Sequence, residues 1–488
     1  MISFNEIPID IRIPGVYIET DNSRAVGGLP AIHHKILVMG QKLTSGSASP
    51  LVPMRITDKS QGEAYFGRGS MLAGMINALK GANNYTETWA IGQNEAAAGV
   101  QAEGAVKFGG AVTAAGTLNL YIAGQRVRVA VGAADTLNAI ATAVAAAINA
   151  KTDLPVTAAV DSVDTTKVKL TCRWKGETGN AIDIRVNYYQ GEKLPAGMTA
   201  TVTAMTGGTS NPALTEIWAA IGDEMYQTII SPYTDTANMQ SLNTETRRRW
   251  GAMVKRETHA FVAAAGSHSA ISTLGSACNY EFITGMGTQA SPTTPWEIAA
   301  IVGAVDAYEP DPARPRQTLL LPGMMAPAPE DRYTFVERNL HLFDGVSTYI
   351  VDDGGQCRIE RLITTYQTNA VGVEDISYLN IETMRTIAYL RYSARTRIAL
   401  RYPRHKLASD GTEIAPGQAI VTPRIIRSEL IALFIQWMGA GLVEGLEQFK
   451  SDLIVERNAG DPDRVDAVIP PDCINQFRVF AASLQFRL

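Results

Sequence analysis

Short apolar runs alternate with helical segments over two stretches of this sequence, and this alternation constrains the fold more than any other feature. The expected strands include HKILVMG at 34–40 and YQTIISP at 226–232, and expected helices lie at 71–80 and 237–250. Strands that alternate with helices form a largely parallel sheet covered by helices. We therefore predict the α/β fold class, with a central α/β layer domain.

The alternation stops near residue 94 and resumes near residue 211. The intervening stretch is rich in Ala, Thr, Val and Gly, and its expected strands, such as GTLNLYIAG and QRVRVAVG, surround one Ala-rich helix at 136–150. Insertions at exposed loops are well tolerated. We predict that 94–210 is a β-rich domain inserted into the α/β domain.

Proline-rich connectors after residue 311 lead to a different pattern. A helix at 333–342 precedes a hairpin with the turn Asp353-Gly354-Gly355, and a long helix is expected at 376–402. Thr422 and Pro423 have the residue types of a helix N-cap and first helical position. These elements predict an α+β domain near the C-terminus.

The patterns together predict six segments. They are an N-terminal strand arm at 1–27, the two parts of the central domain at 28–93 and 211–328, the inserted outer domain at 94–210, the C-terminal α+β domain at 329–475 and a C-terminal strand arm at 476–488.

Each end of the chain has the alternation of an isolated strand. Prolines 8 and 14 confine the first strand to a sheet edge. An unpaired strand exposes backbone groups and one apolar row, and pairing with another chain provides both with partners. We predict that both arms lodge in neighbouring subunits, so that head-to-tail contacts propagate a polymer. The apolar positions are Ile7, Ile9, Ile11, Ile13, Val16 and Ile18 in the N-terminal arm, and Phe480, Leu484, Phe486 and Leu488 in the C-terminal arm.

Composition and motifs favour no cofactor, metal or membrane span. Charged residues make up 19% of the 488 residues, the net charge is −5, and the four cysteines lie far apart. No phosphate-binding glycine motif is present, adjacent His33 and His34 would point to opposite faces of a strand, and the acidic run 461–466 lacks the glycine of a calcium loop. No signal peptide or apolar run long enough to span a bilayer is found, so synthesis in the cytoplasm is expected.

Two alternative functions remain at this stage. The run GGTSNPA at 207–213 resembles the surroundings of a subtilisin nucleophile. It makes Ser210 the candidate nucleophile of a serine hydrolase on a subtilisin-like α/β core, but the motifs for the histidine and aspartate partners are missing. The segment 381–406 has seven basic residues against the single acid Glu382, which could bind nucleic acid or an acidic protein surface. The basic residues are Arg385, Arg391, Arg395, Arg397, Arg401, Arg404 and Lys406.

Four sequence stretches resemble the tail sheath proteins of Mu-like contractile-tailed phages. They are IPGVYIE near the N-terminus, FVERNLHLFDGVSTYIVDDGGQCRIERLITTYQ, YPRHKLASDGT and DPDRVDAVIPPDCINQFRVFAASLQFRL. The resemblance implies a non-enzymatic subunit that forms hexameric rings, stacked helically around a tail tube in a metastable extended state. The sheath would contract to drive the tube through the host envelope and deliver the genome.

The resemblance also implies partners, a location and residue roles. The partners are further copies of the chain, the tail tube protein, and baseplate and tail terminator proteins, without nucleic acid or membrane insertion. The location is the virion tail, assembled in the host bacterial cytoplasm. The expected receiving hairpin for neighbouring arms spans 346–366. The receiving residues in it are Val346, Tyr349, Val351, Ile359 and Leu362, and the expected tube-facing residues are Arg424 and Arg427.

Overall fold

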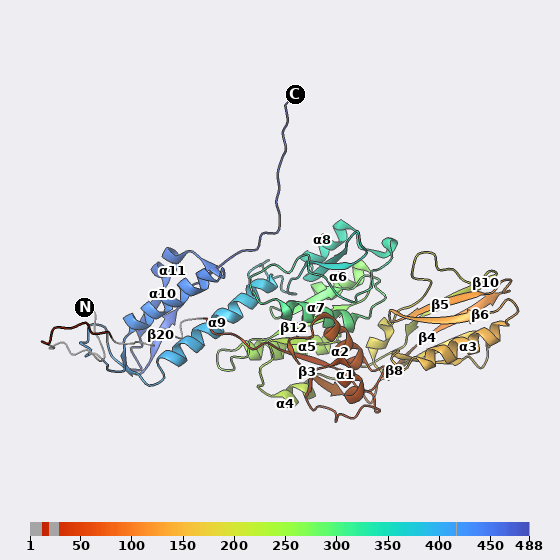
Figure 1. Cartoon of the computed structure of the whole chain (residues 1–488), viewed down its shortest axis with the longest axis horizontal. Coiled ribbons are helices and arrows are strands. Elements are labelled where there is room, and N and C mark those ends of the chain that lie inside the picture. Colours follow the sequence, from red (N-terminus) through yellow and green to blue (C-terminus); the bar gives the residue numbers. More distant parts are fainter. Residues whose placement is uncertain (1–11, 19–28, 416, 488) are drawn as a thin grey trace. The chain divides into compact units, whose positions relative to one another are not determined.

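The computed structural model describes residues 12–18, 29–415 and 417–487 (Figure 1). Contacts divide the chain into two compact units. The larger, here called the core unit, comprises 34–310 and 316–381, and the smaller, the C-terminal unit, comprises 311–315, the residues from Glu382 onward and the described residues up to His33. Each unit is built around its own hydrophobic cluster.

The core unit is organised around an eight-stranded sheet. Six neighbouring strands run parallel, with one antiparallel strand at each edge. The interior strand β1 (Lys35–Gln41) carries Ile36, Leu37 and Val38, which are all fully buried because both faces of a parallel sheet are covered. The predicted α/β layer is confirmed. In sheet order the strands are β15 (Cys357–Arg361), β14 (Val346–Val351), β13 (Ile283–Gly287), β12 (His259–Ala264), β11 (Thr228–Ile230), β1 (Lys35–Gln41), β3 (Glu87–Gln93) and β2 (Met54–Ile56).

Helices connect these strands. α7 is apolar around most of its circumference and almost entirely buried, because it packs against α2 as well as against β11 and β12. Several helices begin at a capping side chain, among them Asp58 before α1 and Asp235 before α5. The helices are α1 (Lys59–Phe66), α2 (Met71–Ala82), α4 (Thr215–Ile221), α5 (Thr236–Trp250), α6 (His268–Ser276), α7 (Pro295–Tyr308) and α8 (Phe335–Phe343).

The stretch predicted as an insertion forms two antiparallel sheets and one helix between β3 and α4. Helix α3 (Leu137–Ala150) packs on strands of both sheets, and its Ile140, Val144 and Ile148 are buried there. The contacts of the inserted stretch group it with the core unit, and the proposal that it is a separate domain stays a prediction. The strands are β4 (Gln101–Gly110), β5 (Gly116–Ile122), β6 (Gln125–Val131), β7 (Val156–Val160), β8 (Lys167–Lys175), β9 (Ile184–Val186) and β10 (Met198–Thr206).

The C-terminal unit packs three helices and short strand pairs around Phe434, Trp437 and Phe449. Thr422 accepts a hydrogen bond from the Ile425 amide and Pro423 opens the helix, as the sequence predicted. The elements are α9 (Ile381–Arg401), β16 (Lys406–Leu407), β17 (Ile420–Val421), α10 (Pro423–Gly439), β18 (Val443–Glu444), α11 (Leu446–Asp452), β19 (Ile454–Arg457), β20 (Val465–Val468) and β21 (Asp472–Cys473).

The hairpin β14–β15 lies in the core unit, whereas the sequence grouped it with the C-terminal domain that begins at residue 329. β14 pairs with β13 and extends the parallel sheet, so its backbone hydrogen bonds bind it to the core strands. The six predicted segment boundaries therefore remain a proposal that differs here from the contact-based division.

Helix α8 is attached to α6 through a pair of histidines. His268 Nδ1 lies 2.7 Å from His341 Nε2, and the two rings stack with their centroids 4.5 Å apart. His341 is buried, and the Tyr333 ring contacts it edge-on. Burial is the main cause that lowers the pKa of His341 below its ordinary value.

Acidification should weaken this attachment. Above about pH 6.5 His341 is neutral in both folded and unfolded chains. As the pH falls below that value, the unfolded chain takes up the proton first, because the folded pKa is lower, and stability is lost until the folded group also titrates. His268, Glu337 and Asp344 are the other charged or titratable groups that act on it.

Hydrogen exchange of α8 amides between pH 7.5 and 5.5 measures this effect. Protection should fall toward pH 5.5 in the native protein and change less in His341→Gln. The matched control is His405→Gln, which alters an exposed histidine of the C-terminal unit. Equal pH dependence of α8 in all three proteins would refute the assignment.

Candidate functional site: terminal arms and strand edges

The C-terminal arm presents its apolar side chains to solvent. Residues 477–487 have no helix or strand assigned, and the exposed fractions of Phe480, Leu484 and Phe486 are 80%, 94% and 78%. Monomeric proteins rarely leave a contiguous row of large apolar side chains exposed. A solvent-exposed apolar row such as 480–486 is what a strand that pairs with another chain requires. Leu488 lies outside the described residues.

A buried ion pair fixes the point where this arm leaves the C-terminal unit. Arg478 Nη2 lies 2.7 Å from Oε2 of Glu382 at the start of α9, and the Glu382 side chain is fully buried. A buried carboxylate without a cationic partner is strongly unfavourable. Arg478 is therefore part of the folded unit, and the fully exposed portion of the arm begins after it.

The N-terminal arm is described only in part. Ile13, Val16 and Ile18 have exposed fractions of 72%, 90% and 87%, and no strand is assigned over 12–18. The Tyr17 hydroxyl donates to the Ile13 carbonyl at 3.1 Å. Ile7, Ile9 and Ile11 fall outside the described residues, so their predicted role stays a prediction.

The predicted receiving hairpin has both of its edges occupied by its own chain. β14 pairs with β13, and the outer edge of β15 pairs with the segment 318–321. In that pairing Thr318 N donates to Ile359 O at 2.7 Å, Ile359 N to Leu319 O at 2.9 Å and Leu321 N to Cys357 O at 2.9 Å. Val346, Tyr349, Ile359 and Leu362 are buried within the core unit and Val351 is half-buried. These contacts do not favour the predicted receiving role.

A second hairpin, β19–β20, has the open edges that the first one lacks. Its two strands pair only with each other, from Ile454 with Val468 to Arg457 with Val465. Within the described residues, no backbone hydrogen bond from elsewhere reaches the outer edge of either strand. Val455 packs against the cluster of the C-terminal unit, whereas Ile454 and Val468 on the other face are more than half exposed.

The sequence predicted no receiving role for these two strands. The run 461–466, which lacks the glycine of a calcium loop, forms the turn of the hairpin, with Arg464 N donating to Asp461 O. The signal that could have identified the receiver is that a two-stranded hairpin with apolar residues on both faces is rarely stable alone.

The two arginines proposed to face the tube have different environments. Arg424 is exposed near the first turn of α10, and its amide donates to Asp410 Oδ1 at 2.9 Å. Arg427 is half-buried, and its guanidinium donates to the carbonyl of Lys450 in α11. Arg427 therefore holds two helices of its own unit together, and Arg424 is the better placed to meet another protein.

The basic helix α9 uses part of its charge within its own unit. Arg397 and Arg401 both pair with the buried Glu429 of α10, the latter at 2.9 Å, and Arg397 also reaches Gln436 Oε1 at 3.3 Å. Two of the seven basic side chains thus satisfy a buried carboxylate. Such an arrangement stabilises helix packing and is not the solvent-facing row that duplex binding requires.

At the position where doubly wound sheets usually bind ligands, two glutamines hold the connections to the insertion. β1 has β3 on one side and β11 on the other, so the strand order reverses there. Gln41 and Gln93 end β1 and β3, and their amides donate to the carbonyls of Lys175 and Ala213, both at 2.8 Å. Side chains that would face a ligand thus hold the connecting segments instead.

Ser210, the alternative nucleophile, is exposed in a left-handed conformation with φ of 62°. The described hydrogen bonds include none that joins it to a histidine. A search of the described residues found no cluster of three potential metal-ligating side chains, and none of their helices is long and apolar enough to cross a bilayer.

Comparisons with known proteins agree on one family. The family model of the phage tail sheath protein central domain matches residues 207–365, and that of the phage tail sheath C-terminal domain matches residues 373–487. The Mu-like prophage FluMu tail sheath protein of Haemophilus influenzae is 43% identical over 489 residues, covering 100% of both chains.

Solved structures with weaker likeness include other sheath proteins. The sheath tail protein of Desulfitobacterium hafniense is 14% identical, covers 94% of this chain and 100% of its own, and has a TM-score of 0.48. The helical sheath of the anti-feeding prophage in the contracted state is 10% identical, with coverage of 97% and 99% and a TM-score of 0.48.

Proposed function

Because this chain belongs to the phage tail sheath protein family, we propose that it polymerises around a tail tube and joins its neighbours by exchanging terminal strands. The chain is a structural subunit of a contractile tail. The observation that carries the strand exchange is that the same chain has exposed apolar arms and, among its described residues, a hairpin whose two outer edges are open.

The number of strand arms equals the number of open hairpin edges in this arrangement. Each subunit supplies two arms, one at each end, and the hairpin β19–β20 offers two edges. If one edge receives the N-terminal arm of one neighbour and the other edge the C-terminal arm of a second, every strand in the interior of the lattice is paired. Main-chain hydrogen bonds then provide affinity, and the exposed Ile454 and Val468 meet the apolar rows of the arms.

The reach of the C-terminal arm is sufficient for exchange. An extended chain advances about 3.3 Å per residue, so the part beyond Arg478 spans about 30 Å. A tether of this length anchored at one end allows subunits to rotate and slide without separating. In the sheath the arms would therefore keep neighbours connected while the interfaces between rigid units rearrange during contraction.

The remaining partners follow from the same proposal. Hexameric rings stack into the sheath, the exposed Arg424 on α10 meets an acidic surface of the tail tube protein, and the ends of the sheath meet baseplate and tail terminator proteins. Assembly takes place in the host bacterial cytoplasm. The tail acts mechanically, without catalysis by this chain, and its sheath contacts proteins and not nucleic acid.

Electron microscopy of the purified protein tests the proposal. Hollow, striated tubes, or rings that stack into such tubes when tail tube protein is added, are expected. A protein that stays monomeric at high concentration, with and without tube protein, would contradict it.

A proline at the outer edge of β20 should block polymerisation. Asn458 N bonds Arg464 O, and the alternation of an antiparallel pair therefore points the backbone groups of Val465 and Ala467 outward. Ala467→Pro removes one outward donor while leaving the hairpin ladder intact. We expect tubes to be lost by microscopy while the circular dichroism spectrum is retained.

The control for this variant is Ala467→Ser, which keeps the backbone donor and should polymerise. Normal tubes from Ala467→Pro would show that the edge of β20 does not receive an arm. Such a result would refute the receiving role of the hairpin. It would not refute the sheath function, because tubes would still form.

A further inference from the structure

Helix α8 carries its apolar face outward. The exposed fractions of Phe335, Val336, Leu340 and Phe343 are 74%, 65%, 46% and 65%. These positions are spaced 1, 4 and 3 residues apart, so they share one side of the helix. A surface helix normally turns such a face toward the core. α8 therefore presents a continuous apolar strip, here called the α8 face.

The opposite side of α8 is fixed to the core unit by polar contacts. Arg338 Nε lies 2.9 Å from Glu360 Oε2, and its Nη1 donates to the Tyr333 carbonyl at 2.7 Å. Thr334 and Glu337 form a capping box at the first turn, and His341 pairs with His268. The outward orientation is thus determined by specific contacts, and a rotation of the helix that buried the α8 face would break them.

A second exposed apolar patch of the core unit lies at the tip of a short hairpin that follows β15. Thr368 pairs with Glu374 across this turn. Val371, Val373 and Ile376, here called the tip, have exposed fractions of 82%, 59% and 70%.

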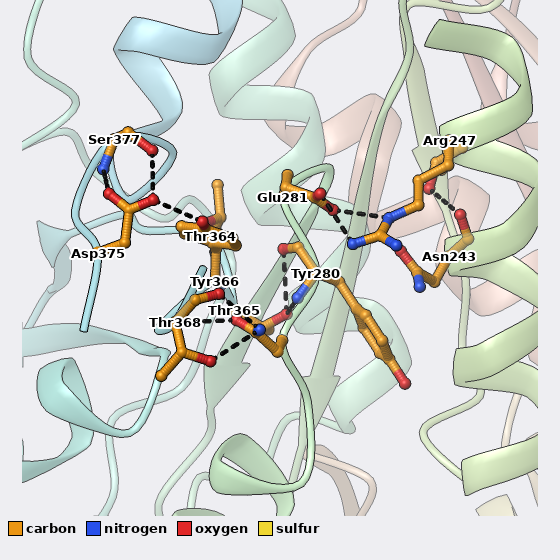
Figure 2. Close-up of polar contacts among 12 residues, drawn as sticks. Asn243, Arg247, Tyr280, Glu281, Thr364, Thr365, Tyr366, Thr368, Asp375 and Ser377 are labelled. Atoms are coloured by element: carbon orange, nitrogen blue, oxygen red, sulfur yellow. Dashed lines mark hydrogen bonds and ion pairs between the residues drawn. The ribbon is translucent and has the colours of Figure 1, made fainter. Parts of the chain in front are cut away.

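Hydrogen bonds within the chain hold the tip in one conformation. Asn369 Oδ1 accepts from the amides of Val371 and Val373 at 3.0 and 3.1 Å. Figure 2 shows Asp375 between Tyr366 and Ser377, with the Tyr366 hydroxyl 2.6 Å from Asp375 Oδ2. Thr365 and Thr368 tie the base of the turn to 279–280. A preordered loop loses little conformational entropy when it binds.

We propose that the tip of one subunit packs on the α8 face of a second copy of this chain. Both patches belong to the core unit, so one rigid body carries two different apolar surfaces. A head-to-tail contact requires two such unlike surfaces on each subunit, and it propagates when the rotation does not close. The α8 face offers a strip along a helix, and the tip offers a narrow apolar projection that covers part of it.

A second copy is the occupant that the observations favour. Under the proposed polymerisation many copies of this tail sheath family member lie beside one another, so the local concentration of this partner exceeds that of any other. The inference rests on the proposed polymerisation but not on the strand arms, because it uses core-unit residues alone. It adds a contact between rigid units to the flexible connection through the arms.

Mixed cysteine variants test the pairing of the two patches. Phe343→Cys and Val371→Cys are made separately in a Cys473→Ser background, because the other three native cysteines are buried. Mixed copies should give oxidised dimers that contain one chain of each variant. Met253→Cys, at an 89% exposed position elsewhere in the core unit, replaces each partner in turn as the matched control and should give at least tenfold less cross-linked dimer.

The cross-linking yields distinguish the proposed pairing from its alternatives. Cross-linking of Phe343→Cys with itself but not with Val371→Cys would overturn the head-to-tail pairing, and equal yields with Met253→Cys would overturn the contact. Repeating the reaction with protein that lacks 479–488 separates this contact from exchange of the C-terminal arm, because that exchange is absent there while the core-unit contact should still give the mixed dimer at high concentration. Absence of tubes from the full chain would count against the sheath function and not against this pairing.

Discussion

Removal of residues 479–488 should give a folded subunit that no longer forms tubes. The ten residues include the exposed Phe480, Leu484 and Phe486, which no part of the described chain covers. Loss of solvent-facing side chains leaves the stability of the subunit nearly unchanged. Loss of this arm removes one of the two proposed strand pairings of each subunit, so sedimentation and negative-stain microscopy should show no tubes at concentrations where the full chain polymerises.

The truncation has to end after Arg478. A deletion that begins at Gln476 would also remove the guanidinium that pairs with the buried Glu382, and would then destabilise the unit for an unrelated reason. The distinction separates failure to assemble from failure to fold.

Alternation along the arm supplies a matched pair of full-length controls. Leu484→Asp with Phe486→Asp places charges on the apolar row and should abolish tubes. Ser483→Asp with Gln485→Asp places the same charges on the other face and should disturb polymerisation far less. Tubes from the truncated chain, or equal effects of the two double variants, would reject strand exchange through this arm.

Replacement of Glu429 by alanine should destabilise the C-terminal unit by about 3–5 kcal/mol. Its buried carboxylate pairs with Arg397 and Arg401, and its removal leaves the Arg397 guanidinium buried without that partner. The loss should appear as a lower denaturant midpoint for unfolding of α9 and α10, followed by hydrogen exchange and by the fluorescence of Trp437, which is buried in the same unit.

The control is Glu447→Ala. Glu447 forms an exposed pair with Lys450 at 2.7 Å, and its side chain is 85% exposed, so its removal should change stability by less than about 1 kcal/mol. If both variants unfold at the same denaturant concentration, the pairing of α9 with α10 does not depend on Glu429. Unchanged stability would also reopen the possibility that the basic residues of α9 serve an outside partner.

Local patterns in the sequence were sufficient to predict the layers of the fold. The parallel sheet follows from apolar runs such as 35–41 that alternate with helices, and the start of α10 follows from Thr422 and Pro423. Both depend on residues close together in the chain. The position of β14–β15 in the core sheet depends on pairing with β13, far away in sequence, and the alternation in a strand does not specify its neighbour.

The strand arms could be predicted from the sequence, but the hairpin that receives them could not. An arm can be recognised because its apolar row has no partner in the adjacent sequence. A receiving edge is defined by the hydrogen bonds that it lacks, and the occupation of the β15 edge by 318–321 involves irregular chain without a strand pattern. For the same reason the outward face of α8 could not be foreseen, since the sequence period of a helix shows an apolar face but not its direction.

The anchor between Arg478 and Glu382 has a mechanical consequence. Pulling on an arm loads its strand along the backbone, so the bonds of the ladder share the shear and have to break together. If the arms exchange as proposed, the tension reaches Arg478, where its ion pair with Glu382 passes part of the load into the first turn of α9, a helix braced by Glu429 against α10, and the backbone carries the rest toward β21. In a lattice joined by such arms, one branch of the load path would therefore run from one hairpin to the next along the axis of α9.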